Sequence, residues 1–373
     1  MHDFRSKRCS STQNPSSRGT GCACWRISLD AREALGIIAS GKTLSRAEAE
    51  AAMGSVMAGE ATAAQLGALL AALHVRGETA DEIAGFASAM RANALRVVVD
   101  DGAIDVVGTG GDRSNSINIS TISALVVAGA GGHVAKHGNR AASSQCGSAD
   151  VLEALGVRID LGPDGVAQCV REVGVGFMFA PRFHPAMRHA GPVRREIGIR
   201  TVFNVLGPLA NPAGVRRYLL GVPSVALGAT IAAALVELGA ERALVVHGTD
   251  GLDEISPSAD TRTWEVSSGS VREGHLAPED LGLRRAERIE ITGGDPATNA
   301  TAARAVLDGT HGGARTAVLM NAAAALWVAG LAGSVKEGVA IVTRAIDGGA
   351  ARDALARFAA TSQRIGAAEG ARA

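Results

Sequence analysis

This 373-residue chain has few aromatic residues and no net charge. Aromatic side chains make up 3% of it, and Lys plus Arg equal Asp plus Glu at 37 each. Proteins that bind single-stranded nucleic acid stack bases on aromatic side chains and carry a basic groove, and this composition provides neither. Nothing in the overall composition therefore points to nucleic acid or a membrane surface as a partner.

The N-terminus lacks the apolar stretch of a secretory signal. Residues 1–30 are rich in Ser, Arg and Gly, and we interpret them as a disordered tail. This tail holds three of the five cysteines, without the paired His or Cys ligands of a zinc site. The other two, Cys146 and Cys169, are isolated, which predicts reduced thiols in a cytoplasmic protein.

Two uncharged stretches, 218–236 and 316–335, are as long as a membrane span. Both are Ala-rich and interrupted by Gly, Pro or Asn. Neither has an aromatic belt or positively charged flanks. We therefore interpret both as buried core helices.

The chain length suggests about two domains. The segment from residue 31 to 95 is helical in pattern, with capping boxes at Ser45, Thr62 and Thr79, each followed three residues later by Glu or Gln. From residue 100 onward, predicted strands and helices alternate, which is typical of an α/β domain. The last predicted helices cover 297–308, 316–329 and 335–358.

The most informative stretch begins with Ile104–Val107, a β-branched run that predicts a short buried strand. The sequence Gly-Thr-Gly-Gly-Asp follows at 108–112. Its glycines permit positive φ angles and let backbone N–H groups approach a ligand closely. The polar segment 114–121 then opens an apolar helical run. This places a helix N-terminus, which favours phosphate, beside the glycine loop.

A second loop, Lys-His-Gly-Asn-Arg-Ala-Ala-Ser-Ser at 136–144, places the cations Lys136 and Arg140 ahead of a helix expected from about 143 to 155. The glycine loop matches neither the dinucleotide fingerprint nor the P-loop, and alone it is also explained by an ordinary turn. Two anion-binding loops so close in sequence, however, favour a ligand with two phosphate groups.

Two further stretches have charges suited to a site. Residues 187–195 contain three arginines, including Arg194, whose guanidinium groups could bind a carboxylate; a solvated helix face explains them equally well. Residues 247–254 read as a strand followed by a loop ending in Asp253-Glu254. Adjacent carboxylates suit Mg²⁺, although a solvated acidic turn is the commoner explanation of any single pair.

Taken together, these motifs resemble the anthranilate phosphoribosyltransferase family. The resemblance rests on four segments: GTGGD at 108–112, NxST at 118–121, KHGNRAASS at 136–144 and VFNVLGPLANP at 202–212. It extends from about residue 33 to about residue 365. Pyrimidine nucleoside phosphorylases share the wider fold and have a related basic loop with a different sequence.

The resemblance implies an α/β fold in which a small helical domain packs on a larger α/β domain with a central, mostly parallel sheet. We expect the helical domain to comprise residues 31–99, joined by 193–214, with the turn at 207–212 carrying the chain back. Residues 100–192 and 215–373 would form the domain that binds phosphoribosyl pyrophosphate. The active site is expected in the cleft between the domains, and the molecule is expected to be a homodimer formed through the helical domain.

The implied reaction transfers the phosphoribosyl group of phosphoribosyl pyrophosphate to the amino group of anthranilate, releasing pyrophosphate, in tryptophan biosynthesis. The implied cofactor is Mg²⁺, held by Ser120, Asp253 and Glu254. Because an aromatic amine is neutral at pH 7, we expect no covalent nucleophile and no essential general base. The residues implied to contact anthranilate are Gly108, His137, Asn139 and Arg194, with Met187 standing where some relatives have an aromatic residue. The residues implied to bind phosphoribosyl pyrophosphate are Gly108, Gly111, Asp112, Ser116, Asn118, Ile119, Ser120, Thr121, Lys136, His137, Gly138, Asn139, Arg140, Ala141, Ala142, Ser143, Ser144 and Ser148.

Two other functions were weighed against this one. A nucleoside phosphorylase would need a pocket for a pyrimidine ring, and would need neither Arg194 nor the acidic loop. A non-enzymatic nucleic-acid binder with the same fold should have an excess of basic residues and should have lost the motifs of the phosphate loops. This chain shows neither feature.

Overall fold

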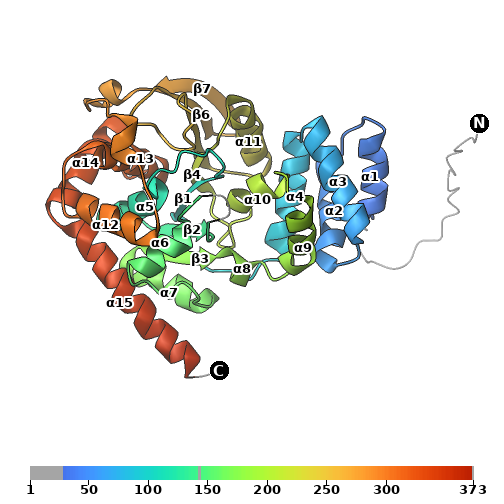
Figure 1. Ribbon diagram of the computed structural model, residues 1–373, viewed down its shortest axis with the longest axis horizontal. Coiled ribbons are helices and arrows are strands. Elements are labelled where there is room, and N and C mark those ends of the chain that lie inside the picture. The colour runs from blue at the N-terminus through green and yellow to red at the C-terminus, as the bar shows by residue number, and fades with distance from the viewer. Residues whose placement is uncertain (1–27, 142–143, 372–373) are drawn as a thin grey trace, which may run out of the picture.

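A computed structural model describes residues 28–141 and 144–371 of the chain. Most of the expected N-terminal tail, together with Ala142 and Ser143, therefore lies outside the described residues. A bundle of helices stands at one end of the molecule and a larger α/β part at the other (Figure 1).

The bundle is formed by α1 (Ala31–Ala39), α2 (Arg46–Ala58), α3 (Ala63–Arg76), α4 (Ala80–Ala92) and the distant α9 (Met187–Ile197). The three predicted capping boxes are confirmed. The side chains of Ser45, Thr62 and Thr79 each accept a hydrogen bond from the backbone N–H three residues later, and the side chain of that later residue accepts one from the N–H of the capping residue. Helix α9 packs against α2 and α3, so a segment far along the chain completes the bundle. The domain boundaries at 99, 193 and 214 stay a prediction.

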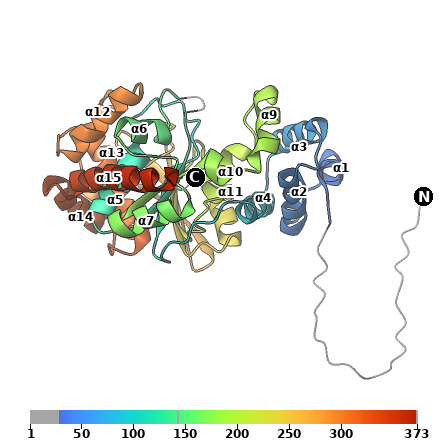
Figure 2. The same ribbon diagram turned by 90° about the horizontal axis from the view of Figure 1, so that it is seen from below.

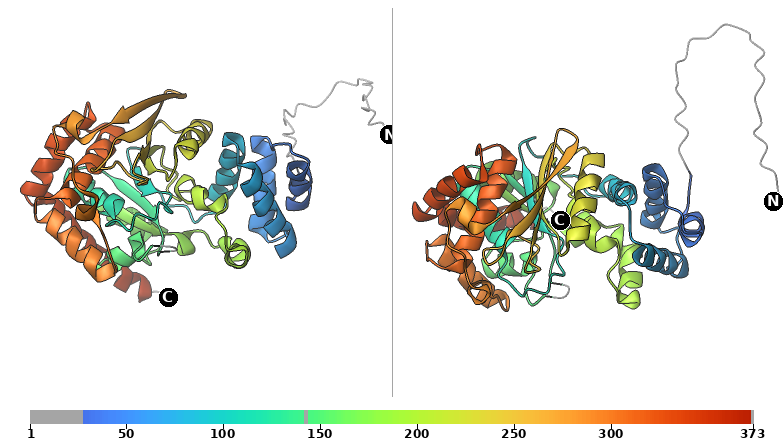
Figure 3. Two further views of the ribbon diagram at one scale, coloured as in Figure 1. Left: turned by 45° about the horizontal axis from the view of Figure 1, so that its top comes forward. Right: turned by 90° about the horizontal axis from the view of Figure 1, so that it is seen from above.

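The α/β part is built on one sheet of seven strands, in the order β3-β2-β1-β4-β5-β6-β7. Neighbours from β3 to β5 are parallel, whereas β6 and β7 form an antiparallel hairpin that extends the sheet at one edge (Figure 3). This hairpin was not predicted from the sequence. The strands are β1 (Ile104–Gly108), β2 (Val134–Gly138), β3 (Val175–Phe179), β4 (Arg217–Gly221), β5 (Arg242–Gly248), β6 (Thr261–Ser267) and β7 (Ser270–Leu276).

Helices cover both faces of this sheet. On one face α5 (Ile119–Gly129) and α13 (Gly313–Ala329) pack against the strands, with α14 (Val335–Asp347) and α15 (Ala350–Gly370) outside them (Figure 2). On the other face α10 (Phe203–Leu209) and α11 (Val225–Glu237) contact both the sheet and α4, and so connect the two parts. The remaining helices are α6 (Ser148–Ala154), α7 (Pro163–Val173), α8 (Ala180–Phe183), α12 (Pro296–Leu307) and the 3₁₀ helices η1 (Pro278–Leu281) and η2 (Arg288–Ile291).

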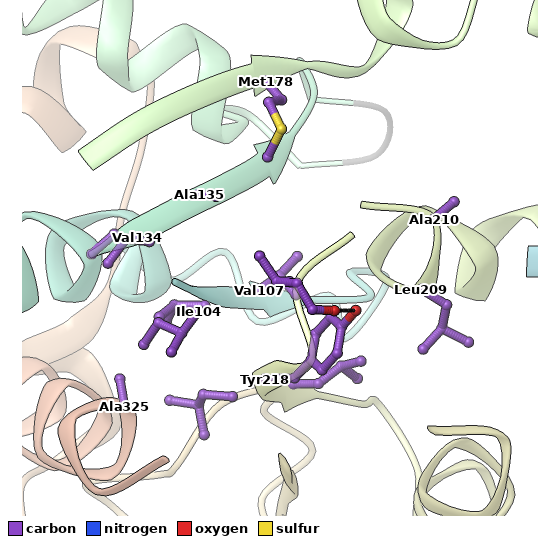
Figure 4. Packing of buried hydrophobic residues seen from close by; sticks show 14 of the residues in the cluster. Ile104, Val107, Val134, Ala135, Met178, Leu209, Ala210, Tyr218 and Ala325 are labelled. Atoms are coloured by element: carbon purple, nitrogen blue, oxygen red, sulfur yellow. Dashed lines mark hydrogen bonds between the residues drawn. The ribbon is translucent and has the colours of Figure 1, made fainter. Parts of the chain in front are cut away.

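The core lies between the sheet and these helices. Ile104 of β1 faces Ala325 of α13, while Tyr218 of β4 turns toward Leu209 at the end of α10 (Figure 4). Arg91 of α4 donates hydrogen bonds to the Leu209 carbonyl and the Tyr218 hydroxyl, at 2.7 and 3.1 Å. The stretch 316–335 contributes α13, which is largely buried as expected, whereas 218–236 contains strand β4 and the helix α11, which is only partly buried. No helix in the described part of the chain is long and apolar enough to cross a membrane.

Three local predictions were wrong. The helix expected from about residue 143 begins only at Ser148, because Gly147 is extended and its N–H bonds to Asp150 as an N-cap. The turn expected at 207–212 is partly helical, since α10 continues to Leu209 and the chain turns afterwards. The single late helix expected at 335–358 is two helices separated at Gly348–Gly349, where Gly349 has a φ of 81°.

The close packing of α2 on α4 depends on a glycine. A Cβ added at Gly85 would lie 2.3 Å from the carbonyl oxygen of Arg46, whereas one added at Gly54, within α2, would meet nothing within 4 Å. We predict that Gly85→Ala lowers the free energy of unfolding by about 1–3 kcal/mol. The matched variant Gly54→Ala should raise it by about 0.4–1 kcal/mol. Urea denaturation of both variants checks this, and equal effects would contradict it.

Candidate active site

A cleft of about 1020 Å³ opens between the helical bundle and the α/β part. Its floor is formed where β1 and β4 end. These neighbouring strands lie where the chain order of the sheet reverses, and in α/β sheets ligands bind outside the carboxyl ends of strands at such a point. The glycine loop, the polar segment 114–121, the basic loop, α9, α10 and the acidic loop all contribute to the lining. The structure thus brings most of the predicted segments to one place.

Two glycines let the acidic loop reach this floor. Gly108 and Gly221 are register partners and the last residues of β1 and β4. A Cβ at Gly221 would lie 1.6 Å from the carbonyl oxygen of Asp253, and one at Gly108 would lie 2.4 Å from its Oδ2. Gly110, with a φ of 71°, donates its N–H to the same Oδ2 at 2.6 Å. Asp253 therefore occupies space that side chains on the strand ends would fill.

The two predicted acidic residues are both buried, with Asp253 8% and Glu254 7% exposed. Burial raises the pKa of Asp253 well above its ordinary value, and repulsion from Asp112 and Glu254 raises it further. Burial also raises the pKa of Glu254 to about 7, against the attraction of Lys136. Glu254 accepts a hydrogen bond at 3.1 Å from the N–H of Ser120, in the first turn of α5. The acidic loop is therefore not a solvated turn.

These groups fit an open site for a hard divalent cation. In the described residues no three His, Cys, Asp or Glu side chains form a complete metal cage. Mg²⁺ needs none, because it usually keeps several waters and binds one or two carboxylates together with substrate phosphates. The carboxylates of Asp253 and Glu254, with the Ser120 hydroxyl beside them, supply such oxygen donors.

Lys136 lies beneath the phosphate loops with 3% of its surface exposed. Its Nζ donates to the carbonyl oxygen of Val106 and, at 3.3 Å, to the hydroxyl of Ser120. Burial lowers the pKa of Lys136, while Asp105, Glu254 and Asp253 raise it. The amine thus lies in the floor of the cleft, where burial and the neighbouring acids act on its pKa in opposite directions.

Two buried histidines face each other on the wall of the cleft. The rings of His137 and His184 are 5.0 Å apart in an edge-to-face arrangement, and each Nε2 is buried without a hydrogen-bond partner in the described residues. Burial lowers the pKa of His137 to about 3 and that of His184 to about 4, so both rings are neutral at pH 7. His184 was not among the predicted site residues.

Two predicted residues of the basic loop, Asn139 and Arg140, line the cleft and also have partners outside it. The Arg140 guanidinium bonds to Asp150 and Glu153 and lies 5.5 Å from the centre of the Phe179 ring. Asn139 accepts from its neighbour's N–H through its side chain. Gly138, Ala141, Ser144 and Ser148 line the cleft, as do Gly111, Ile119 and Thr121 of the first loop.

The polar segment is tied down by a residue far along the chain. Asn299, 1% exposed, donates to the side-chain oxygen of Asn118 at 2.8 Å, and Asn118 in turn donates to the Cys146 carbonyl at 3.1 Å. Ser116 pairs with Thr292 in an isolated β-bridge. Asn118 thus connects α12 with the segment that follows the basic loop. The sequence does not show this connection, because Asn118 and Asn299 are 181 residues apart.

Across the cleft, Arg194 of α9 is partly buried, with its guanidinium 5.1 Å from the centre of the Phe203 ring. Burial lowers its pKa. No carboxylate pairs with it among the described residues. Arg200, which the sequence analysis did not single out, donates to the Gly110 carbonyl at 3.2 Å. Beneath the basic loop the buried Asp105 accepts from Asn211 at 2.7 Å and from the N–H of His137 at 3.3 Å.

A helical bundle joined to a mixed α/β sheet, with a cleft lined by glycine, basic and acidic loops between them, defines a two-domain glycosyl transferase. Two family profiles match accordingly: "Glycosyl transferase family, helical bundle domain" over residues 32–94 and "Glycosyl transferase family, a/b domain" over residues 100–352. The chain belongs to the anthranilate phosphoribosyltransferase family. It is 56% identical to the anthranilate phosphoribosyltransferase of Thermomicrobium roseum over 337 residues, which is 89% of this chain and 97% of that protein.

Solved structures agree. The anthranilate phosphoribosyltransferase of Thermus thermophilus is 46% identical with a TM-score of 0.84, covering 88% of this chain and 99% of that one. The Saccharomyces cerevisiae enzyme in complex with PRPP and Mg is 29% identical with a TM-score of 0.82, covering 90% and 98%. The same yeast enzyme was also solved with 4-fluoroanthranilate. The protein is therefore an enzyme with anthranilate phosphoribosyltransferase activity in tryptophan biosynthesis, and the predicted family, fold class and activity are confirmed.

The buried histidines predict a loss of stability in acid. The folded protein disfavours the charged His184 ring, whose pKa is about 4, whereas an unfolded histidine titrates near 6.5. Burial of His184 therefore costs no stability above about pH 6.5, and the free energy of unfolding falls as the pH drops toward 4. By pH 5 the loss caused by His184 amounts to about 2 kcal/mol. Urea unfolding gives the free energy of unfolding lost between pH 7 and pH 5, and this loss should be smaller by that amount in His184→Gln than in the wild type. An equal loss in both proteins would contradict the assignment.

Proposed function

We propose that the diphosphate of phosphoribosyl pyrophosphate lies along the glycine loop 108–112 and the N-terminus of α5, above the amine of Lys136. Three features support this placement. The loop has two consecutive positive-φ glycines, Gly110 and Gly111, which turn its backbone. The N-terminus of α5, whose helix dipole favours an anion, lies beside the loop and lines the cleft. The Lys136 amine lies on the cleft floor, within hydrogen-bond distance of the Ser120 hydroxyl.

The metal role predicted for Asp253, Glu254 and Ser120 belongs to the same proposal. Two buried carboxylates with raised pKa values leave uncompensated negative charge once both ionise, and a divalent cation removes that cost. When bound, Mg²⁺ would neutralise the charge that builds up on the departing pyrophosphate. The yeast relative crystallised with PRPP and Mg supports this assignment.

The chain's own residues orient the two substrates and are not needed as acids or bases. The anthranilate amine is already neutral and nucleophilic, so its attack on C1 of the ribose needs no strong base. The C1–N bond forms as the C1–O bond to pyrophosphate breaks, and the amine loses a proton to solvent. We propose that the neutral rings of His137 and His184, with Asn139, line the approach of the aromatic ring. The gain in rate then comes from orienting the two substrates and neutralising the leaving group.

Arg194 is the observation on which the substrate assignment depends. Its guanidinium is partly buried in the cleft wall and pairs with no acid among the described residues. A desolvated cation in this position gains most from a ligand that carries its own carboxylate. Stacking on Phe203 holds the guanidinium in place. Anthranilate, a carboxylate on an aromatic ring, has the required chemistry.

We predict opposite effects for the two cations. Arg194→Ala removes a charge-assisted hydrogen bond worth roughly 1.5–3 kcal/mol, so kcat/KM for anthranilate should fall by roughly ten- to a hundred-fold. The KM for phosphoribosyl pyrophosphate should barely change. Lys136→Met, which keeps the length of the side chain, should raise the KM for phosphoribosyl pyrophosphate and spare that for anthranilate. Steady-state kinetics with each substrate varied in turn measure both effects.

The control for this comparison is Arg171→Ala, an exposed arginine of α7 that lies outside the cleft lining. It should leave both Michaelis constants within about two-fold of the wild-type values, since exposed charges contribute little. If Arg194→Ala leaves anthranilate use untouched, or damages both substrates equally, the carboxylate role is wrong.

We also propose that the enzyme is a homodimer formed through the helical bundle. The bundle exposes apolar surface: Val75, near the end of α3, is 86% exposed. Burying such side chains against a second copy would remove that surface from water. The reduced state of the buried Cys146 and Cys169 suits the cytoplasm, where we propose that the enzyme works.

Light scattering tests the dimer directly. At micromolar concentration the particle mass should be about twice the chain mass of 37.8 kDa. Val75→Asp, which places a charge on the proposed contact, should shift the mass toward that of a single chain, while the equally peripheral Ile289→Asp in the α/β part should not. A wild-type mass of one chain would rule out the proposal.

A further inference from the structure

One fully buried polar side chain has no part in the chemistry described so far. Asn321 stands in the middle of α13, 0% exposed, within a run of alanines and large apolar residues. An amide at such a position is costly unless its hydrogen bonds are satisfied. Those of Asn321 are all satisfied, and two of the three go to one residue of the acidic loop.

Asn321 and Ile255 exchange a pair of hydrogen bonds. The Ile255 N–H donates to Oδ1 of Asn321 at 3.0 Å, and Nδ2 of Asn321 donates to the Ile255 carbonyl at 2.9 Å. The second hydrogen of Nδ2 goes to the Ala317 carbonyl, one turn back in α13, at 2.9 Å. The side-chain amide thus binds Ile255 as a neighbouring strand would, at a point where the chain belongs to no strand.

Ile255 directly follows the acidic pair. Its side chain is fully buried, so its main-chain groups have no access to water. On the other side of the pair, the carbonyl of Asp253 lies against Gly221 at the end of β4. Asp253 and Glu254 are therefore held between the sheet and α13. Asn321 is the contact that fixes the α13 side.

We propose that Asn321 is a positioning residue for the metal and diphosphate end of the reaction, acting through Ile255 on Asp253 and Glu254. The inference rests on the proposed metal role of these two carboxylates. An amide suits the task because it offers one donor and one acceptor side by side, matching the carbonyl and N–H of a single residue. A carboxylate would lose the donor and an aliphatic side chain would lose both.

The test compares Asn321→Leu with Val318→Ala, a fully buried residue of the same helix that lies outside the cleft lining. Both variants lose stability, but only the first releases Ile255. The free Mn²⁺ signal in electron paramagnetic resonance, recorded with inorganic pyrophosphate present, reports metal affinity without turnover. Residues that orient metal ligands typically change affinity by about 10- to 100-fold, and a loss in this range is expected for Asn321→Leu. Val318→Ala should bind Mn²⁺ as the wild type does.

Kinetics supply the second measurement. Asn321→Leu should raise the Mg²⁺ concentration for half-maximal velocity and the KM for phosphoribosyl pyrophosphate, while the KM for anthranilate stays near the wild-type value. If Asn321→Leu does not fold, Asn321→Ala, which cannot clash, takes its place. Unchanged Mn²⁺ affinity in the Asn321 variant, or an equal loss in Val318→Ala, would overturn the proposal. Asp253→Asn is the reference: if it binds Mn²⁺ as tightly as the wild type, the metal role itself fails.

Discussion

The burial of two adjacent carboxylates against the ends of two strands is the constraint on which the rest of this structure depends. Asp253 can lie there only because Gly108 and Gly221, paired across β1 and β4, have no side chains. Buried charge of one sign is costly, and the neighbouring groups reduce that cost: Lys136 beneath, the N–H of Gly110 and the first turn of α5. This arrangement of charges is the one that the proposed binding of a cation together with an anion requires.

The opposite wall has a different character. Its partly buried guanidinium comes from α9 of the helical bundle, whereas its neutral imidazoles come from His137 of β2 and from His184, directly after α8. One side of the cleft is thus polar and ionic, and the other is suited to an aromatic carboxylate. This division explains why the chain needs two parts: α9 completes a bundle far from the sheet, while α10 and α11 pack the bundle onto it.

The sequence predicts the features that depend on neighbours in the chain. The capping boxes at Ser45, Thr62 and Thr79, the glycine loop and the basic loop are local signals, and the structure has them where expected. It does not reveal partners separated by a hundred residues or more. Asn299 and Asn211 look like ordinary helix and turn residues until the fold brings them to Asn118 and Asp105. The hairpin was missed for a different reason, because most side chains of its outer strand are exposed and show no apolar alternation.

The most direct test of the central claim is the position of the metal. Crystals grown with Mn²⁺ and phosphoribosyl pyrophosphate would reveal the ion by its anomalous scattering. The account predicts a peak within about 2 Å of a carboxylate oxygen of Asp253 or Glu254, with diphosphate oxygens completing its ligands. A bound diphosphate whose metal lies away from both carboxylates would contradict it.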